Sequence, residues 1–217
     1  MVSSGASIKA LVGESMLKQL NGTCVIYGAG VAYESNGFEV KMANRFGCAV
    51  HAFDCTMNDE EQLREYIHNQ ENLSNLAFHP WCVGEEGKVT QELFQNSKTY
   101  DYSRAHEAMV SLQTIMEWLG HEEVDLLKFD VEGFEWKLFD NILSSKHLPK
   151  QISFELHTRH ANMHYVPPHL VAEKGKEAVV KLFDRLYRLG YRVVSKELNF
   201  GDYRCAEFVL YQFYSPG

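Results

Sequence analysis

The chain has 217 residues, of which 45% are hydrophobic and 23% are charged, as in ordinary soluble globular domains. This composition excludes a disordered chain and a small disulfide scaffold, and no apolar run approaches the roughly 18–20 residues of a membrane-spanning helix. The formal net charge of −8 argues against a nucleic-acid partner, because such affinity comes largely from cationic contacts with phosphates.

The first half of the chain alternates predicted helices with short buried strands. Residues 1–20 indicate an amphipathic N-terminal helix and lack the features of a signal peptide. As written the chain therefore reads as cytoplasmic, although a trimmed lumenal domain of a secretory-pathway protein would look the same. Strands are predicted at residues 23–27, 48–53 and 75–78, helices at 38–46 and after the capping pair Asn58 and Glu61, and a hairpin or loop at 83–92.

The second half continues the alternation and then closes with two adjacent strands. Helices are predicted at residues 112–119, from 134 to 143 and at 172–189, and strands at 124–129, 151–156, 191–194 and 206–213. This order predicts one α/β domain over 1–217, with its core at 23–213. Its mostly parallel, Rossmann-like sheet has helices on both faces and an antiparallel C-terminal pair at one edge.

The five cysteines are scattered along the chain. No CxxC pair is present, which excludes a zinc ribbon. Cys24 and Cys48 fall in predicted buried strands, where we expect free thiols that act as small apolar groups.

The first two strands end in residues suited to a nucleoside-containing cofactor. Tyr27, Gly28 and Gly30 end the first strand, and glycines there let the backbone approach a ligand closely. Asp54 ends the second strand, where a carboxylate can accept both ribose hydroxyls. The alternatives are a tight turn that needs glycine and a simple strand-end cap.

Acidic residues directly follow the predicted strand at 124–129. Asp130 is a candidate to coordinate a metal, orient the cofactor or accept a substrate proton. Glu132 can cap the next helix or bind substrate. We expect Glu135 to face outward on that helix as a capping residue.

The neighbouring strand ends in Glu155 and His157. Asp130 and Glu155 together can form an oxygen site for a divalent cation. His157 is a candidate third ligand or general base, because its ordinary pKa of about 6.5 suits proton abstraction near neutrality. Alternatively, Glu155 only pairs with Lys128 or Arg159.

These motifs resemble a known family. Residues 126–139, LLKFDVEGFEWKLF, resemble the signature of FkbM-type methyltransferases. Residues 24–30 and 38–56 are similar to the cofactor-binding half of the animal methyltransferase-like branch, and ISFELH at 152–157 matches its fifth strand. The resemblance implies a class I S-adenosylmethionine-dependent methyltransferase with a seven-stranded sheet.

The resemblance also implies roles for individual residues. Gly28 and Gly30 would face the methionine part of S-adenosyl-L-methionine, Asp54 would bind the ribose, and Asp130 would stand at the junction of cofactor and substrate.

The first motif departs from the usual class I pattern. Ile26 and Tyr27 stand where such enzymes often carry an acidic residue. Glu34 and Glu39 are therefore candidates to contact the methionine amino group instead.

The resemblance and the residues together predict O-methylation of a hydroxyl group on a small-molecule or glycan acceptor. His157 is the first candidate base, followed by Asp130 and Glu132, and a cation between Asp130 and Glu155 would lower the hydroxyl pKa. One alternative is a catalytically inactive methyltransferase-fold binding protein. The other is a nicotinamide-dependent oxidoreductase, which the lack of a complete GxGxxG motif disfavours.

Overall fold

The computed structural model describes residues 22–31, 37–54, 73–79, 81–84, 109–131, 133–158 and 174–214. In these ranges seven strands form one sheet in the order β3-β2-β1-β6-β7-β9-β8, and β4 pairs with β5 in a small second sheet. The strands are β1 Val25–Ala29, β2 Ala49–Phe53, β3 Leu76–His79, β4 Cys82–Val83, β5 Met109–Val110, β6 Leu126–Phe129, β7 Gln151–His157, β8 Tyr191–Leu198 and β9 Cys205–Gln212. The helices are α2 Phe38–Phe46, α5 Leu112–Leu119, α6 Glu135–Ser144 and α7 Lys176–Arg188.

The large sheet is parallel except for β9. β1 pairs in parallel with both β2 and β6, so the strand order reverses beside β1. β9 lies antiparallel between β7 and the edge strand β8. This arrangement confirms the predicted α/β fold, and it places the carboxyl ends of β1, β2, β6 and β7 along one edge, at a topological switch point.

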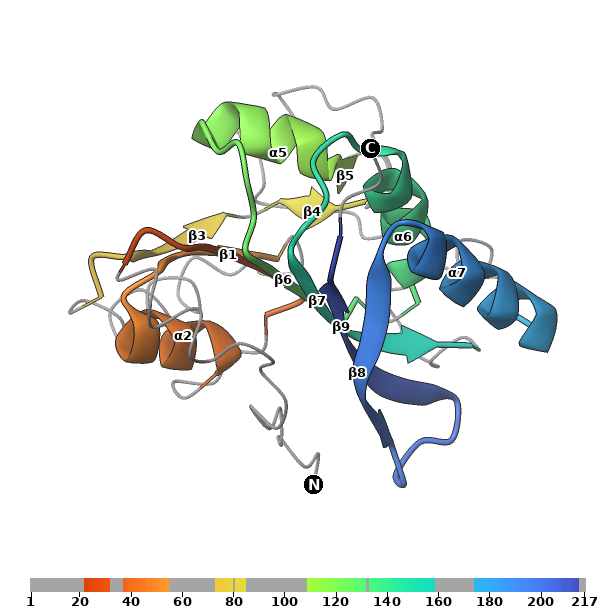
Figure 1. Ribbon diagram of the computed structural model, residues 1–217. Helices are drawn as coiled ribbons and strands as arrows, with labels where there is room; N and C mark the ends of the chain where they lie inside the picture. Colours follow the sequence, from red (N-terminus) through yellow and green to blue (C-terminus); the bar gives the residue numbers. More distant parts are fainter. Residues whose placement is uncertain are drawn as a thin grey trace.

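Helices cover both faces of the sheet. Figure 1 shows α5, α6 and α7 on one face and α2 on the other. Local sequence sets the ends of these helices: the Ser111 side chain accepts a hydrogen bond from Thr114 N at the start of α5, and Gly120 ends it with a φ of 70°. The helical packing therefore leaves the carboxyl edge of the sheet to the connecting segments.

The main core lies between the sheet and the α5–α6–α7 layer. Its centre is aromatic: the Phe129 ring lies 5.2 Å from Phe139 and 5.4 Å from Phe154, measured between centroids. A second apolar cluster packs Met42 and Phe46 of α2 against the opposite face. Both faces of the central strands are thus buried, which explains their nearly continuous apolar sequences.

Some sequence predictions differ from the structure in extent. β8 reaches Leu198, four residues beyond its predicted end, and α7 begins at Lys176. Val83, predicted in a hairpin or loop, belongs to β4, which pairs in parallel with β5. The predicted helices at 1–20 and after Asn58 lie outside the described residues. None of the helices described is long and apolar enough to cross a membrane.

The prediction of free thiols at Cys24 and Cys48 is wrong, because these residues form a disulfide. They precede β1 and β2, and the parallel register that pairs Val25 with Ala49 also places their Cα atoms 4.7 Å apart. Cys82 is disulfide-bonded as well, whereas Cys205 is a buried free thiol. The chain therefore carries a cross-link between the first two strands of its sheet.

We expect the Cys24–Cys48 bond to stabilise the domain by about 3 kcal/mol, because it closes a 24-residue separation and restricts the unfolded chain. Urea unfolding of the native protein and of Cys24→Ala/Cys48→Ala, each with and without dithiothreitol, measures this. The difference in the free energy of unfolding between the two proteins should be about 3 kcal/mol larger under oxidising conditions than under reducing conditions. Equal differences would show that the loss comes from packing alone.

Candidate active site

The carboxyl edge of the sheet brings together most of the predicted site residues. Asp130 follows β6 and its N–H donates to Ala29 O at 3.1 Å, while Gly30 N donates to Phe53 O at 3.1 Å. These bonds continue the parallel pairing just beyond the strands. The described site residues at this edge are Gly28, Gly30, Asp54, Asp130, Glu155 and His157.

Gly30 is required by a close backbone approach. Its φ is +73°, and a Cβ there would lie 1.8 Å from the carbonyl oxygen of Asp130. A Cβ at Gly28 would lie 2.3 Å from Glu39 Oε1. The protein's own packing therefore accounts for both glycines, and their contact with a cofactor stays a prediction.

Asp54 organises the segment after β1. Its Oδ2 accepts a hydrogen bond from Val31 N at 3.1 Å, which ties the end of β2 to the turn after β1. This contact is sufficient to explain why an acidic residue ends β2, even if no ligand binds there. The predicted ribose contact would be an additional role.

Tyr27 has its side chain in the core. It is fully buried among the residues packed under α5, and its hydroxyl lies 2.7 Å from His121 Nδ1. A ligand contact at Tyr27, as predicted from the sequence, would therefore be made by its backbone.

Glu39 on α2 is a buried carboxylate at this edge. It is only 2% exposed, its Oε1 lies beside Gly28, and this atom has no hydrogen-bond partner among the described residues. Burial raises the pKa of Glu39, and the nearby Lys128 ammonium opposes that rise. The Lys128 Nζ itself donates to Gly30 O at 3.0 Å. A buried, unpartnered acceptor of this kind fits the amino group of an incoming ligand.

Asp130 is a second carboxylate with a buried oxygen at this edge. Burial raises its pKa to about 6, opposed chiefly by the charge of Lys128. Its Oδ1 is buried and has no hydrogen-bond partner in the described part of the chain. A carboxylate with this pKa is ionised at neutral pH and can accept a proton from a bound acceptor.

Glu135 does not face outward as predicted. It is fully buried, and its Oε1 accepts hydrogen bonds from Val131 N at 3.1 Å and Gly133 N at 3.0 Å. The same oxygen lies 3.1 Å from His157 Nδ1. Its position at the start of α6 allows this inward orientation, because the free N–H groups before the helix supply the donors that a buried carboxylate needs.

Glu155 and His157 lie on one face of β7. Glu155 Oε1 accepts from Asn199 Nδ2 at 3.1 Å, and its Oε2 lies 3.8 Å from His157 Nε2. Lys128, one predicted partner of Glu155, instead donates a hydrogen bond to Gly30 O. Arg159, the other predicted partner, lies outside the described residues, and so does Glu132.

Two groups of side chains bring metal-ligating atoms within 4.8 Å of one another. Asp130 groups with Glu135 and His157, and Glu155 groups with His157 and Cys205. His157 is common to both groups. Neither of these groups contains the predicted pair of Asp130 with Glu155.

A histidine cluster on the α5 face was not anticipated from the sequence. His51 Nδ1 lies 2.9 Å from His79 Nε2, and the His51 ring lies 4.9 Å from that of His121. Burial, followed by the charges of the other two rings, lowers the pKa of His51 to about 4. His51 is therefore neutral at physiological pH, and burial also lowers the pKa of His79 and of His121. The signal available in the sequence was the position of His51 and His79 within apolar strands.

The sheet order and the carboxyl-edge residues together define a class I methyltransferase fold. A family profile described as a methyltransferase domain matches residues 5–212. The chain therefore belongs to this methyltransferase-domain family, which confirms the resemblance at family level. The narrower FkbM-type assignment stays a prediction.

Two curated relatives are similar to this chain. One is the probable methyltransferase-like protein 24 of Rattus norvegicus, 29% identical over 138 residues, which cover 62% of this chain and 33% of that protein. The other is its namesake in Homo sapiens, 28% identical over 143 residues, which cover 63% and 33%. The match thus spans about a third of the length of these relatives.

Solved structures show weaker similarity. The 23S rRNA methyltransferase ErmE has a TM-score of 0.47 at 9% identity, covering 94% of this chain and 69% of that one. The TrmK protein of M. capricolum in complex with S-adenosyl-homocysteine has a TM-score of 0.46 at 9% identity, covering 93% and 68%. Similarity at this level identifies neither the cofactor nor the acceptor of this chain.

We expect Asp130→Asn to stabilise the domain at alkaline pH. The folded-state pKa of Asp130 is raised to about 6 from 3.8, so the folded state binds the proton more tightly and loses stability as the pH rises through this window. Asparagine does not titrate. Between pH 4 and pH 8 the free energy of unfolding of the variant should therefore rise by roughly 2 kcal/mol relative to that of the native protein.

Urea unfolding in metal-free buffer at both pH values measures this gain. Asp140→Asn is the matched control, because Asp140 is 70% exposed and pairs with Arg185 on the helical surface. An identical pH dependence for the native protein and Asp130→Asn would contradict the prediction.

Proposed function

We propose that this methyltransferase domain binds S-adenosylmethionine and methylates a hydroxyl oxygen of a small-molecule or sugar acceptor. The observation that carries the proposal is a pair of carboxylates at the carboxyl edge of the sheet, Glu39 and Asp130, each with a buried oxygen that has no hydrogen-bond partner among the described residues. Unpartnered buried acceptors are costly, and they persist most readily where a ligand supplies the missing donors.

Two carboxylates would hold the cofactor. Glu39 would accept the amino group of the methionine part beside Gly28, the role expected of an acidic residue near the first motif. Asp54, already oriented by Val31 N, would accept the ribose hydroxyls. When bound, the cofactor supplies an electrophilic methyl group on a sulfonium sulfur.

Asp130 is the base in this proposal. Its pKa of about 6 keeps it ionised at neutral pH while leaving it basic enough to take the acceptor proton. His157, the first choice from the sequence, has Nδ1 directed at Glu135 and is nearly fully buried. His157 is therefore not the base in this proposal, but it would lie on the acceptor side of the site. Glu132 keeps its predicted role near the acceptor.

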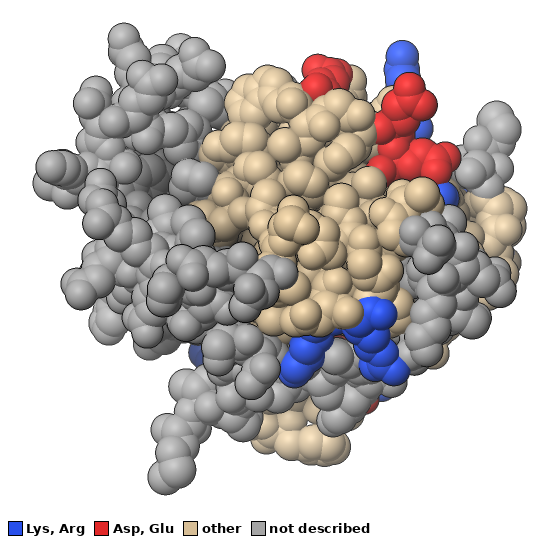
Figure 2. Space-filling model, turned by 90° about the vertical axis from the view of Figure 1, so that its left-hand side faces the viewer, with Lys and Arg blue, Asp and Glu red and all other residues tan. Residues whose placement is uncertain are grey.

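The surface charge supports a small acceptor over a nucleic acid. Figure 2 shows the side of the molecule on which β3 lies, and its described surface is mainly uncharged. On this described face a small group of Lys and Arg lies on the α2 side, and a few more lie beside the Asp and Glu side chains on the α5 side. A polyanion would find little cationic surface there.

The disulfide between Cys24 and Cys48 favours an oxidising compartment, because such bonds are rare in reducing cytosol. Of the two localisations left open by the sequence, we therefore propose the lumen of the secretory pathway. Glycans and small secreted metabolites are acceptors available in that environment.

We expect the native protein to bind S-adenosylhomocysteine in a calorimetric titration and Asp54→Asn to bind it about 10–100-fold more weakly. The loss corresponds to one or two charge-assisted hydrogen bonds to the ribose. Asp140→Asn should bind like the native protein, because that residue lies on the helical surface far along α6. Failure of the native protein to bind would overturn the proposal.

Methyl transfer is detected by mass spectrometry, as one methyl group replacing a hydroxyl proton on sugars or phenols supplied with S-adenosylmethionine. We expect Asp130→Asn to lower kcat by about 10²–10⁴, the usual contribution of a general base, and the native rate to rise as the pH passes 6. Methylation of amine acceptors alone would contradict the proposed chemistry. Cofactor binding without turnover would indicate a binding protein.

A further inference from the structure

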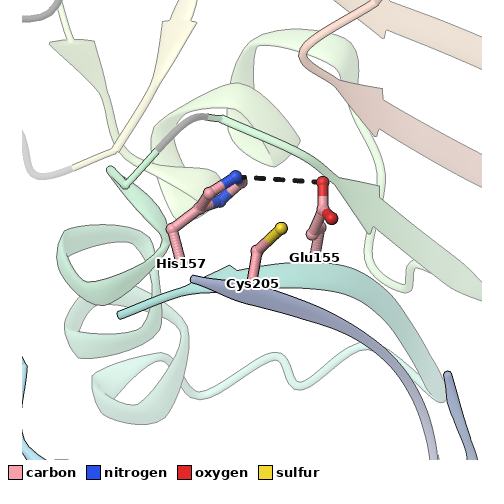
Figure 3. Close-up of side chains that lie close together, drawn as sticks. All are labelled: Glu155, His157 and Cys205. Atoms are coloured by element: carbon pink, nitrogen blue, oxygen red, sulfur yellow. Dashed lines mark ion pairs between the residues drawn. The ribbon is translucent and has the colours of Figure 1, made fainter. Parts of the chain in front are cut away.

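We propose that Glu155, His157 and Cys205 form a binding site for a divalent transition metal, with zinc the best match. His157 on β7 and Cys205 on β9 are directly paired across the antiparallel register, and Glu155 lies two residues before His157 on the same face. Their ligand atoms all lie within 4.8 Å of one another. Figure 3 shows the three side chains converging above the two strands, with His157 Nε2 3.8 Å from Glu155 Oε2.

The separation of these atoms suits a shared ion better than a direct bond. At 3.8 Å, His157 Nε2 and Glu155 Oε2 are too far apart for a hydrogen bond. Two ligands at about 2.0–2.1 Å from a tetrahedral zinc lie roughly 3.3 Å apart, so a small side-chain shift would close the site. Asn199 Nδ2 holds the other oxygen of Glu155, which keeps Oε2 directed at the histidine.

A second and independent observation is the environment of the other histidine nitrogen. Nδ1 of His157 lies 3.1 Å from Glu135 Oε1, and both residues are almost completely buried. A histidine that ligates a metal through one nitrogen typically donates the other N–H to a carboxylate, which fixes the ring and its tautomer. Glu135 therefore presents Nε2 to the proposed site.

Buried negative charge around His157 would also favour a cation. Oδ1 of Asp130 and Oε2 of Glu135 are both buried, and neither has a hydrogen-bond partner among the described residues. Carboxylates in such positions are stabilised by a nearby positive ion. These two carboxylates therefore favour a metal ion near His157, although neither of them is one of the proposed ligands.

The ligand types decide the class of metal. One imidazole nitrogen, one thiolate and one carboxylate oxygen suit zinc, whereas magnesium and calcium prefer oxygen ligands alone. Cys205 is a free thiol in the structure and would bind as thiolate, releasing its proton to solvent. Three protein ligands leave a fourth position for water or another ligand, as in catalytic zinc sites.

The alternative group of Asp130, Glu135 and His157 is less suited. Glu135 Oε1 already accepts from two backbone N–H groups and contacts His157 Nδ1. A metal bound through that oxygen or through His157 Nδ1 would displace contacts that hold Glu135 in place. Metal binding at the Glu155 group does not depend on the proposed methyl transfer, and only a role for the ion in activating an acceptor hydroxyl would rest on it.

Cobalt(II) titration of the metal-stripped full chain tests the site. We expect one equivalent to bind, with tetrahedral d–d bands and a thiolate-to-cobalt charge-transfer band, and zinc to displace it. Cys205→Ser should lose the charge-transfer band, and Glu155→Gln and His157→Gln should bind at least about 10-fold more weakly. The exposed residues Glu177 and His147 provide matched controls, because Glu177→Gln and His147→Gln should bind like the native chain.

A second measurement does not need a variant: bound zinc should protect Cys205 from alkylation, read from the mass of its peptide. A native chain without a thiolate band, or with a Cys205 that zinc leaves unprotected, overturns the proposal. Loss of cobalt binding in Asp130→Asn but not in Glu155→Gln also overturns it, since the metal would then lie in the other group. Calorimetry with S-adenosylhomocysteine on the metal-free chain reports on the proposed function separately.

Discussion

The whole carboxyl edge depends on the close approach of Gly30 to the backbone of Asp130. A side chain at Gly30 would lie 1.8 Å from the Asp130 carbonyl oxygen, so β1 and β6 can end side by side only because this residue is glycine. The approach fixes where the chain leaves β6, and it leaves Gly30 O to accept from Lys128 Nζ. That ammonium is the main charge opposing the raised pKa values of Glu39 and Asp130. One backbone contact thus positions the site and limits its electrostatic cost.

The buried carboxylates divide into two kinds according to what satisfies them. Glu135 is structural, because one of its oxygens receives two backbone N–H groups and holds His157. Glu39 and Asp130 each keep a buried oxygen without a described partner, and burial raises both pKa values. A fold selected only for stability would replace such groups with apolar or amide side chains. Their retention is understandable if a ligand repays the cost, which is the usual relation between stability and function at a binding site.

The sequence was sufficient for the fold and for bringing most candidate site residues to one edge of the sheet, but not for their pairings. Apolar periodicity and turn residues predict the helices and strands along the chain. Residues that follow the strands can be placed near one another because parallel strands end at one edge of the sheet. The disulfide was missed because Cys24 and Cys48 become neighbours only through the register of β1 with β2. The inward turn of Glu135 was missed because capping and burial share one sequence signal, an acidic residue in a first helical turn. Cys205 was missed because its neighbour, His157, is set by the antiparallel register of β7 with β9.

The antiparallel insertion of β9 gives the site its second side. A purely parallel sheet offers a ligand only its strand ends and the loops that follow, whereas β9 begins at this edge and places Cys205 directly opposite His157. The turn before β9 is itself tied to the site, because Asn199 bonds to Glu155 and Cys205 Sγ to Asp202 O. Changes in the turn between β8 and β9 would therefore act on Glu155 and Cys205 while leaving Gly28, Gly30 and Asp54 in place. The proposed cofactor side and the proposed acceptor side can therefore vary independently, since different strands build them.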